Sequence, residues 1–380
     1  MPLVVAGVDI LVIVQGAALA LLLARLLPGA FRRPPVAPRP EGLADTTVTV
    51  MVPCFNEAQR IGPCLAGLAA QGAPVHEILV VDSGSTDGTR ELVAEAAQRD
   101  ARIRLLTDPP LPPGWVGKVW ALQHGLSVAT GEWILGIDAD TSPRPGLAAA
   151  VVLAAREAGD EVVSFAPRFA GMTAAEQWLQ PSMLLTLVYR FGAAGRRRPP
   201  PGRVMANGQC FLARAEVLRR FGGYEAARGS WADDVSLARH LAQRGVSVGF
   251  LDGSRLYDVR AYESLSHMWR EWGRSFDLSD ATTRVRQWFD VTFIALVQGL
   301  PLPLLVAALA TGAPPRAAAV WVPGTLLTVR CLMLGALWGS YARHTWGFLL
   351  SPLADPVAAV RLLLSTVRRP TQWRGRALSR

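Results

Sequence analysis

The segment GEWILGIDAD at residues 131–140 is the last of four apolar segments that decide the fold. The three before it are TVTVMVP (47–53), HEILVVD (76–82) and IRLLT (103–107), and a helical stretch follows each of the first two. Short β-branched and aliphatic segments are typical of strands. Strands that alternate with helices predict an α/β fold with a mostly parallel sheet and helices on both faces. Such sheets bind ligands at the carboxyl ends of their strands.

Polar side chains gather at three of these strand ends. They are Asn56 with Glu57, Asp82 with Ser83, and Asp138 with Asp140. Packing does not account for three such clusters on one sheet edge, so we expect a ligand there. Alternation along a strand predicts that Asp138 and Asp140 lie on one side of the chain. Two hard carboxylates suit a divalent cation, Mg²⁺ or Mn²⁺, which can bridge the phosphates of a nucleotide, although a lone pair also suits a solvated turn.

The composition excludes several classes of protein. Hydrophobic residues make up 51% of the 380 residues and charged residues only 18%, against about 25% charged in a typical soluble domain. This balance excludes disordered, coiled-coil and collagen-like chains and indicates a globular protein with membrane content. Arginine supplies nearly all of the positive charge, since Lys118 is the only lysine, and Asn56 and Asn207 are the only asparagines. The four cysteines form no CxxC pair, so we expect neither a disulfide framework nor a zinc site.

Apolar runs near both ends are long enough to cross a membrane. Residues 3–24 are followed directly by arginines, which places that end in the cytoplasm by the positive-inside rule. Residues 291–310 and 317–339 flank a short turn and predict a helical hairpin, in which Arg330 faces protein or extends to the membrane surface. Two prolines and an aspartate interrupt 346–365, so a re-entrant or surface-lying segment is favoured there.

The predicted protein is therefore integral to the inner (cytoplasmic) membrane. Its expected parts are a transmembrane helix in 1–27, a linker in 28–44, a cytosolic α/β domain in 45–285, a transmembrane hairpin in 286–345, and a re-entrant or interfacial segment with a basic tail in 346–380.

Three motifs in order resemble glycosyltransferase family 2 on the GT-A fold: VPCFNEAQRIGPCL, ILVVDSGSTDGT and GEWILGIDADT. The resemblance covers most of 45–275. It implies inverting transfer from a nucleotide-diphosphate sugar, usually a UDP-sugar, with the nucleotide or sugar contacted by Pro53, Asn56, Glu57, Asp82, Ser83 and Asp138. It also implies a divalent metal on Asp140, with Asp138 beside it.

Inverting transferases need a base that deprotonates the acceptor hydroxyl. The resemblance implies that an acidic pair supplies it, and GSWADDVSLARHL contains Asp233 and Asp234 at the predicted start of a helix. The second acid of the pair, Asp234, is the expected base, with Asp233 supporting it. An acidic first turn favoured by the helix dipole is the alternative explanation.

Lys118 follows the loop DPPLPPGWVG at another predicted helix start. A cation there is unfavourable for the helix dipole, so we expect a compensating partner, the donor diphosphate. A stray surface lysine is the alternative.

Several segments resemble membrane-bound relatives that glycosylate carotenoids or hopanoids: the loop before Lys118, RVMANGQCFLAR, FLDGSRLYDVRAY and WREWGRS. They imply a lipid acceptor in the bilayer. Asn207 either lines the acceptor side or forms a turn. The apolar face of 265–276 predicts an interfacial helix or one packed on the sheet. The basic run 195–203 attracts anionic lipid or is a solvated loop.

Other functions fit less well. A sugar nucleotidyltransferase needs a Gly- and Arg-rich loop after the first strand, and CFNEAQRIG does not provide one. His267 stands where the QxxRW motif of processive enzymes has Gln, so polymer synthesis is not expected. The arginines flank the membrane segments, which argues against nucleic-acid binding. A catalytically inactive membrane scaffold on the same fold remains an alternative.

Overall fold

The structure, a computed structural model, describes residues 2–39, 43–196, 199–260, 262, 264–311, 318–368, 372–373 and 376–377. Its contacts divide the chain into two units. We call Arg32–Ala170, Ala194–Ala261 and Thr371–Arg380 the α/β unit, and Met1–Phe31, Gly171–Ala193 and Tyr262–Pro370 the helical unit.

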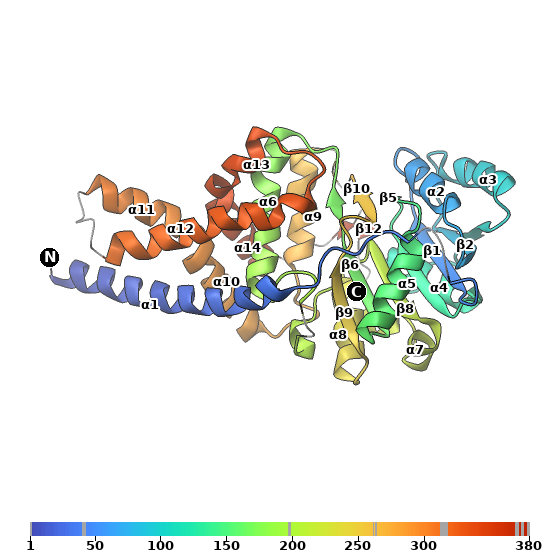
Figure 1. The fold of residues 1–380 in the computed structure, drawn as a ribbon, viewed down its shortest axis with the longest axis horizontal. Helices are drawn as coiled ribbons and strands as arrows, with labels where there is room; N and C mark the ends of the chain where they lie inside the picture. The colour runs from blue at the N-terminus through green and yellow to red at the C-terminus, as the bar shows by residue number, and fades with distance from the viewer. Residues whose placement is uncertain are drawn as a thin grey trace. The chain divides into compact units, whose positions relative to one another are not determined.

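The α/β unit is built on a mixed sheet (Figure 1). The described residues form seven strands of this sheet in the order β3-β2-β1-β4-β8-β6-β9. The strands are β1 (Val48–Cys54), β2 (Val75–Asp82), β3 (Ile103–Thr107), β4 (Trp133–Ile137), β6 (Val162–Ala166), β8 (Cys210–Arg214) and β9 (Val248–Asp252). All neighbours pair in parallel except β8, which is antiparallel to both β4 and β6. A small second sheet pairs β5 (Thr141–Pro143), β10 (Tyr257–Val259) and β7 (Arg168–Phe169).

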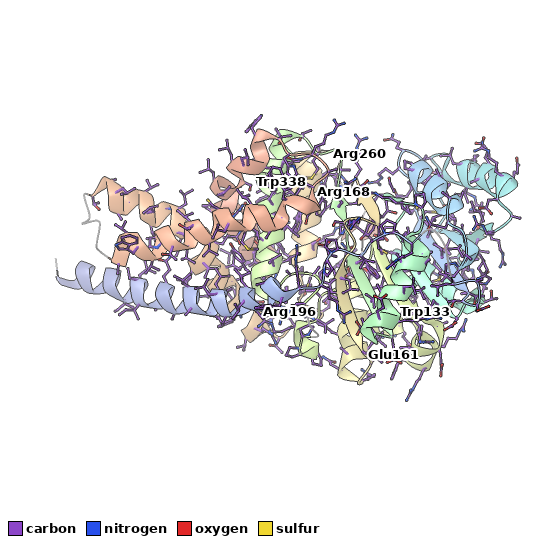
Figure 2. The ribbon with its side chains drawn as sticks, viewed as in Figure 1. Trp133, Glu161, Arg168, Arg196, Arg260 and Trp338 are labelled. Carbon is purple, nitrogen blue, oxygen red and sulfur yellow. The ribbon has the colours of Figure 1, made fainter. Side chains whose placement is uncertain are left out.

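Helices cover both faces of the large sheet. Alternate strand residues point to opposite sides, and apolar residues on both sides need to be buried. Val48, Val50 and Val52 of β1 join one buried cluster, and Met51 joins the other. The first cluster includes residues of α2 (Ile61–Ala69), α3 (Thr89–Arg99) and α5 (Leu147–Ala158), and the second includes residues of α4 (Gly117–Val128), α7 (Ala215–Arg220) and α8 (Asp233–Gln243). Trp133 of β4, labelled in Figure 2, is only 1% exposed.

The predicted α/β class and mostly parallel sheet are confirmed, and the four predicted strands correspond to β1 to β4. One local expectation is wrong. β4 ends at Ile137, and Asp138–Asp140 form a turn before β5 instead of continuing the strand. The amide of Thr141 donates to the carbonyl of Asp138, which turns the chain, so strand alternation does not place the two aspartates.

The helical unit contains apolar helices from both ends of the chain. Within the described residues, three helices are long and apolar enough to cross a membrane: Ile10–Phe31, Ala318–Ser340 and Trp346–Val367. A fourth span results if the pair Arg284–Gly299 and Pro301–Ala310, bent by 44°, is one segment. The bend falls directly before Pro301, and proline is a common cause of helix kinks. Membrane topology stays a prediction.

The other helices of this unit include α6 (Ala174–Phe191), α9 (Leu265–Phe276), α10 (Arg284–Ile294) and α14 (Asp355–Val367). The sequence placed α6 inside the predicted 45–285 domain, whereas its contacts assign it to the helical unit. Its polar side chains explain the difference. Gln177 donates to the carbonyl of Arg343, and Ser182 donates to the carbonyl of Ser351.

Most of the apolar face of α9 is buried. Met268, Trp272 and Phe276 are at most 5% exposed because α9 packs against α14 and α6, whereas Leu265 is 39% exposed. The helix therefore packs on other helices, and contact of its exposed end with a membrane surface stays a prediction. Arg330 faces protein, as one of the two expectations had it, and its guanidinium lies 2.9 Å from the Asp355 carboxylate.

Candidate functional site

Four charged side chains from three elements converge on one recess of the α/β unit. Lys118 comes from the first turn of α4, Asp138 from the turn after β4, and Asp233 and Asp234 from the first turn of α8. They line one recess, together with Pro53 near the end of β1. The fold therefore brings together the predicted base, its neighbour, the predicted sugar contact and the single lysine.

Lys118 is paired with Asp138. Its Nζ lies 2.8 Å from Oδ1 and 3.0 Å from Oδ2 of that carboxylate. Burial alone would lower the pKa of Lys118, but the charges of Asp138, Asp233 and Asp234 raise it above its ordinary value. The cation at the helix start thus has the compensating partners that the sequence argument required, and they are carboxylates of the protein itself.

Backbone amides hold Asp234 in place. The amide of Gly208 donates to Oδ2 at 2.7 Å, and the amide of Val235 donates to Oδ1 at 2.8 Å. Burial and the neighbouring charge of Asp233 raise the pKa of Asp234 to about 7. Burial also raises the pKa of Asp233, against the lowering effect of Lys118. A fixed carboxylate with a pKa near neutrality has the properties of a general base.

Asp140 has a free oxygen in the protein interior. Its Oδ1 is buried and has no hydrogen-bond partner among the described residues. Burial, followed by the charges of Asp138 and Glu57, raises the pKa of Asp140 to about 7. An unsatisfied buried carboxylate oxygen is costly without a cation or proton beside it.

These carboxylates fit a divalent cation in part. Asp140 offers the free oxygen, whereas Asp138 shares both of its oxygens with Lys118. The described residues contain no group of three or more His, Cys, Asp or Glu placed to hold a metal. A cation here would therefore need ligands from a bound substrate, which is usual for Mg²⁺ sites on nucleotide phosphates.

The predicted nucleotide contact Asp82 lies at the end of β2 and is fully buried. Its carboxylate accepts hydrogen bonds from the amides of Gly84 and Ser85 and from the Arg90 guanidinium at 2.8 Å. Burial would raise the pKa of Asp82, but the hydrogen bonds from Ser85 and Arg90 lower it. Asp82 thus shapes the loop after β2, and a nucleotide contact of its carboxylate stays a prediction.

Asn56 also stabilises the loops at these strand ends. Its φ of 55° lies in the left-handed region, which asparagine tolerates better than most residues. Its side-chain oxygen accepts from the amide of Thr86 at 2.9 Å, and its own amide donates to Ser85 at 2.8 Å. These bonds tie the loop after β1 to the loop after β2.

Glu57 and Ser83, two further predicted nucleotide contacts, pair with other side chains of the protein. Glu57 is 5% exposed and lies 2.9 Å from Arg60. The Ser83 hydroxyl donates to Asp108 at 2.8 Å. Burial raises the pKa of Asp108.

Sequence reasoning missed Gly208, Tyr224 and Arg90. Gly208 and Tyr224 line the recess, and Arg90 pairs with Asp82. The dipeptide Asn207–Gly208 is a turn signal that could have drawn attention to this loop. Asn207 itself forms that turn, since its side-chain oxygen accepts from the amide of Gln209 at 2.9 Å. The basic run 195–203 lies partly outside the described residues.

Comparison with known proteins adds three findings. Residues 49–222 match the family model described as Glycosyl transferase family 2. Succinoglycan biosynthesis protein ExoA of Rhizobium meliloti (strain 1021) is 25% identical over 331 residues, which cover 84% of this chain and 92% of that protein. Dolichyl-phosphate beta-glucosyltransferase ALG5C of Trichomonas vaginalis is 37% identical over 105 residues, which cover 26% of this chain and 30% of that protein.

Among solved structures, this chain resembles mannosyltransferase PcManGT from Pyrobaculum calidifontis in complex with GDP-Man and Mn²⁺. The TM-score is 0.59 at 22% identity, with 95% of this chain and 98% of that chain covered. The likeness shows a shared fold.

Proposed function

We propose a specific reaction for this chain, which is a glycosyltransferase with a family 2 domain over residues 49–222 and a GT-A-like fold. It moves a sugar from a nucleotide-diphosphate sugar to a hydroxyl of a membrane lipid, and the configuration of the anomeric carbon is inverted. The observation that carries the proposal is the recess in which Asp234, Lys118 and Asp138 meet. It offers a base, a cation for the departing diphosphate and a carboxylate for the sugar within one cavity.

In the proposed reaction Asp234 removes the proton of the acceptor hydroxyl. The acceptor oxygen then forms a bond to the anomeric carbon of the donor sugar, while the bond from that carbon to the diphosphate oxygen breaks on the opposite side. The amides of Gly208 and Val235 fix the carboxylate for this step. Asp233 tunes the base, because its charge helps to raise the pKa of Asp234 to about 7.

Lys118 is proposed to offset the negative charge that develops on the leaving diphosphate. Its ammonium lies at Asp138, the residue proposed to contact the donor sugar. A bound Mg²⁺ or Mn²⁺ on Asp140, with Asp138 beside it, would supply further positive charge to the phosphates. Pro53, Asn56, Glu57, Asp82 and Ser83 are proposed to form the nucleotide side of the site.

The donor is proposed to be a UDP-sugar and the acceptor a carotenoid or carotenoid glycoside. Support for a lipid acceptor comes from the helices that are apolar enough to cross a membrane. A hopanoid or another polyisoprenoid lipid is the second candidate acceptor, favoured by the relative named as a dolichyl-phosphate glucosyltransferase.

Two experiments test this function. The purified full-length protein in detergent is expected to release UDP from a UDP-sugar in the presence of Mn²⁺, and a matching test with GDP-Man checks the nucleotide. Lipid and pigment profiling of a deletion strain by mass spectrometry is expected to show loss of a glycosylated carotenoid. An unchanged carotenoid profile with altered hopanoids would favour the second acceptor, and unchanged profiles of both would contradict a role for either lipid.

A further inference from the structure

Gly208 lies where three parts of the proposed site meet. It precedes β8 and lines the same recess as Lys118, Asp138 and Asp234. Its amide is one of the two that hold the Asp234 carboxylate, at 2.7 Å from Oδ2. This backbone contact depends on the position of the loop and not on a side chain of residue 208.

The missing side chain matters for a separate reason. A β-carbon built on Gly208 would lie 2.9 Å from the Lys118 Nζ and 3.6 Å from the Asp234 β-carbon. The first distance is shorter than real contacts of a β-carbon, so the ammonium, which ends a flexible side chain, would shift, and the shift itself costs little. The ammonium lies 2.8 Å from Asp138, so even a small shift changes the geometry of that ion pair.

Backbone strain does not explain the glycine. Positive φ angles occur at other glycines of this chain, such as Gly84 and Gly88, but Gly208 does not lie in the left-handed region. An alanine could therefore adopt the same backbone conformation. What a β-carbon would crowd at this position is the Lys118 ammonium.

Resting on the proposed function, we infer that Gly208 is a positioning residue: its lack of a side chain lets the Lys118 ammonium reach Asp138, while its amide aims the Asp234 carboxylate. The loop that contains Gly208 thereby sets the base and the cation of the reaction together. A methyl group at this position would separate Lys118 from Asp138 without removing any charged group.

The test compares Gly208→Ala with Gly62→Ala. Gly62 lies in α2, is not among the residues that line the recess, and a β-carbon there meets nothing within 4 Å. We expect Gly208→Ala to lower kcat about tenfold or more, because misplacing a catalytic group by about 1 Å can cost up to about 10²-fold, with little change in KM for the donor. We expect Gly62→Ala to stay within about twofold of the wild type, because alanine is tolerated in a helix better than glycine.

A double-mutant cycle tests whether Gly208→Ala lowers kcat through Lys118. In a Lys118→Ala background, where the ammonium is absent, Gly208→Ala should lower kcat by less than about twofold. A full additional loss in that background would overturn the inference, because the methyl group would then act on something other than Lys118.

A labelling experiment gives a readout that needs no activity. Lys118 and the amino terminus carry the only amines of the sequence, and the amino terminus serves as an internal reference. Loss of the contact with Asp138 should leave the Lys118 amine more accessible, so that it reacts faster with an amine probe in Gly208→Ala than in the wild type, relative to the amino terminus. Circular dichroism confirms that the variant is folded. Equal labelling in the folded variant and the wild type would overturn the inference, whereas wild-type protein without transferase activity would overturn the proposed function instead.

Discussion

The ends of β2 and β4 both carry aspartates in the sequence, yet the structure uses them differently. At the end of β2, Asp82 is fully buried and receives hydrogen bonds from two amides and an arginine. At the end of β4, Asp140 keeps a buried oxygen without a partner among the described residues, and Asp138 faces an open recess. The comparison teaches that Asp82, whose carboxylate is bound by its own loop and by Arg90, shapes that loop, whereas Asp140 keeps an oxygen that a cation could bind.

The largest expected effect is at Asp234, which lines the same recess as Asp138 at the end of β4. Asp234→Asn should lower kcat by about 10²-fold or more, the usual scale for loss of a general base. Donor affinity should stay near that of the wild type, because the mutation removes the proton acceptor and no donor contact. Steady-state kinetics and calorimetric titration of the donor check this. A collapse of donor binding in the variant would assign Asp234 a structural role.

Substitution of the single lysine should have the next largest effect. Lys118→Ala should lower kcat by about 10²-fold, as expected when a group that stabilises developing negative charge is lost. Lys118→Arg should recover only part of the rate, because the planar guanidinium is bulkier and places its donors differently. The binding test measures whether a nucleotide diphosphate with Mn²⁺ protects Lys118 from an amine-reactive probe. Equal labelling with saturating nucleotide would place Lys118 away from the phosphates.

The pH dependence of kcat should report the buried base. Because burial and Asp233 raise the pKa of Asp234 to about 7, the group is protonated and inactive below that pH. The rate should therefore rise with pH up to about pH 7 and level off above it. A rate that stays constant between pH 5 and 8, at about saturating donor, would contradict Asp234 as the base.

The smallest effect on catalysis is expected at the end of β2. Asp82→Asn should destabilise the fold by about 2 kcal/mol, the scale of a lost hydrogen bond to a charged group, because the Arg90 guanidinium loses its anionic partner. Thermal unfolding followed by circular dichroism measures this loss. A wild-type melting temperature would contradict this structural role and leave Asp82 only its proposed contact with the nucleotide.

Much of the fold could be predicted from the sequence, because the strand and helix signals between residues 47 and 140 are local. The helix starts at Asp233 and Lys118 were also predictable from local composition. The ion pair of Lys118 with Asp138 was not, since it joins residues 20 positions apart across a helix and a strand. The burial of α9 was not predictable either, because its amphipathic pattern fits lipid and protein partners equally well.

The central claim is that the end of β4 holds the metal-dependent donor site. Titration of a UDP-sugar into wild-type protein and Asp140→Ala, each with and without Mn²⁺, tests it most directly. We expect Mn²⁺ to increase donor affinity in the wild type and to have little effect in the variant, because Asp140 supplies the buried oxygen that is free for a cation. The same Mn²⁺-dependent gain in affinity in both proteins would contradict the claim.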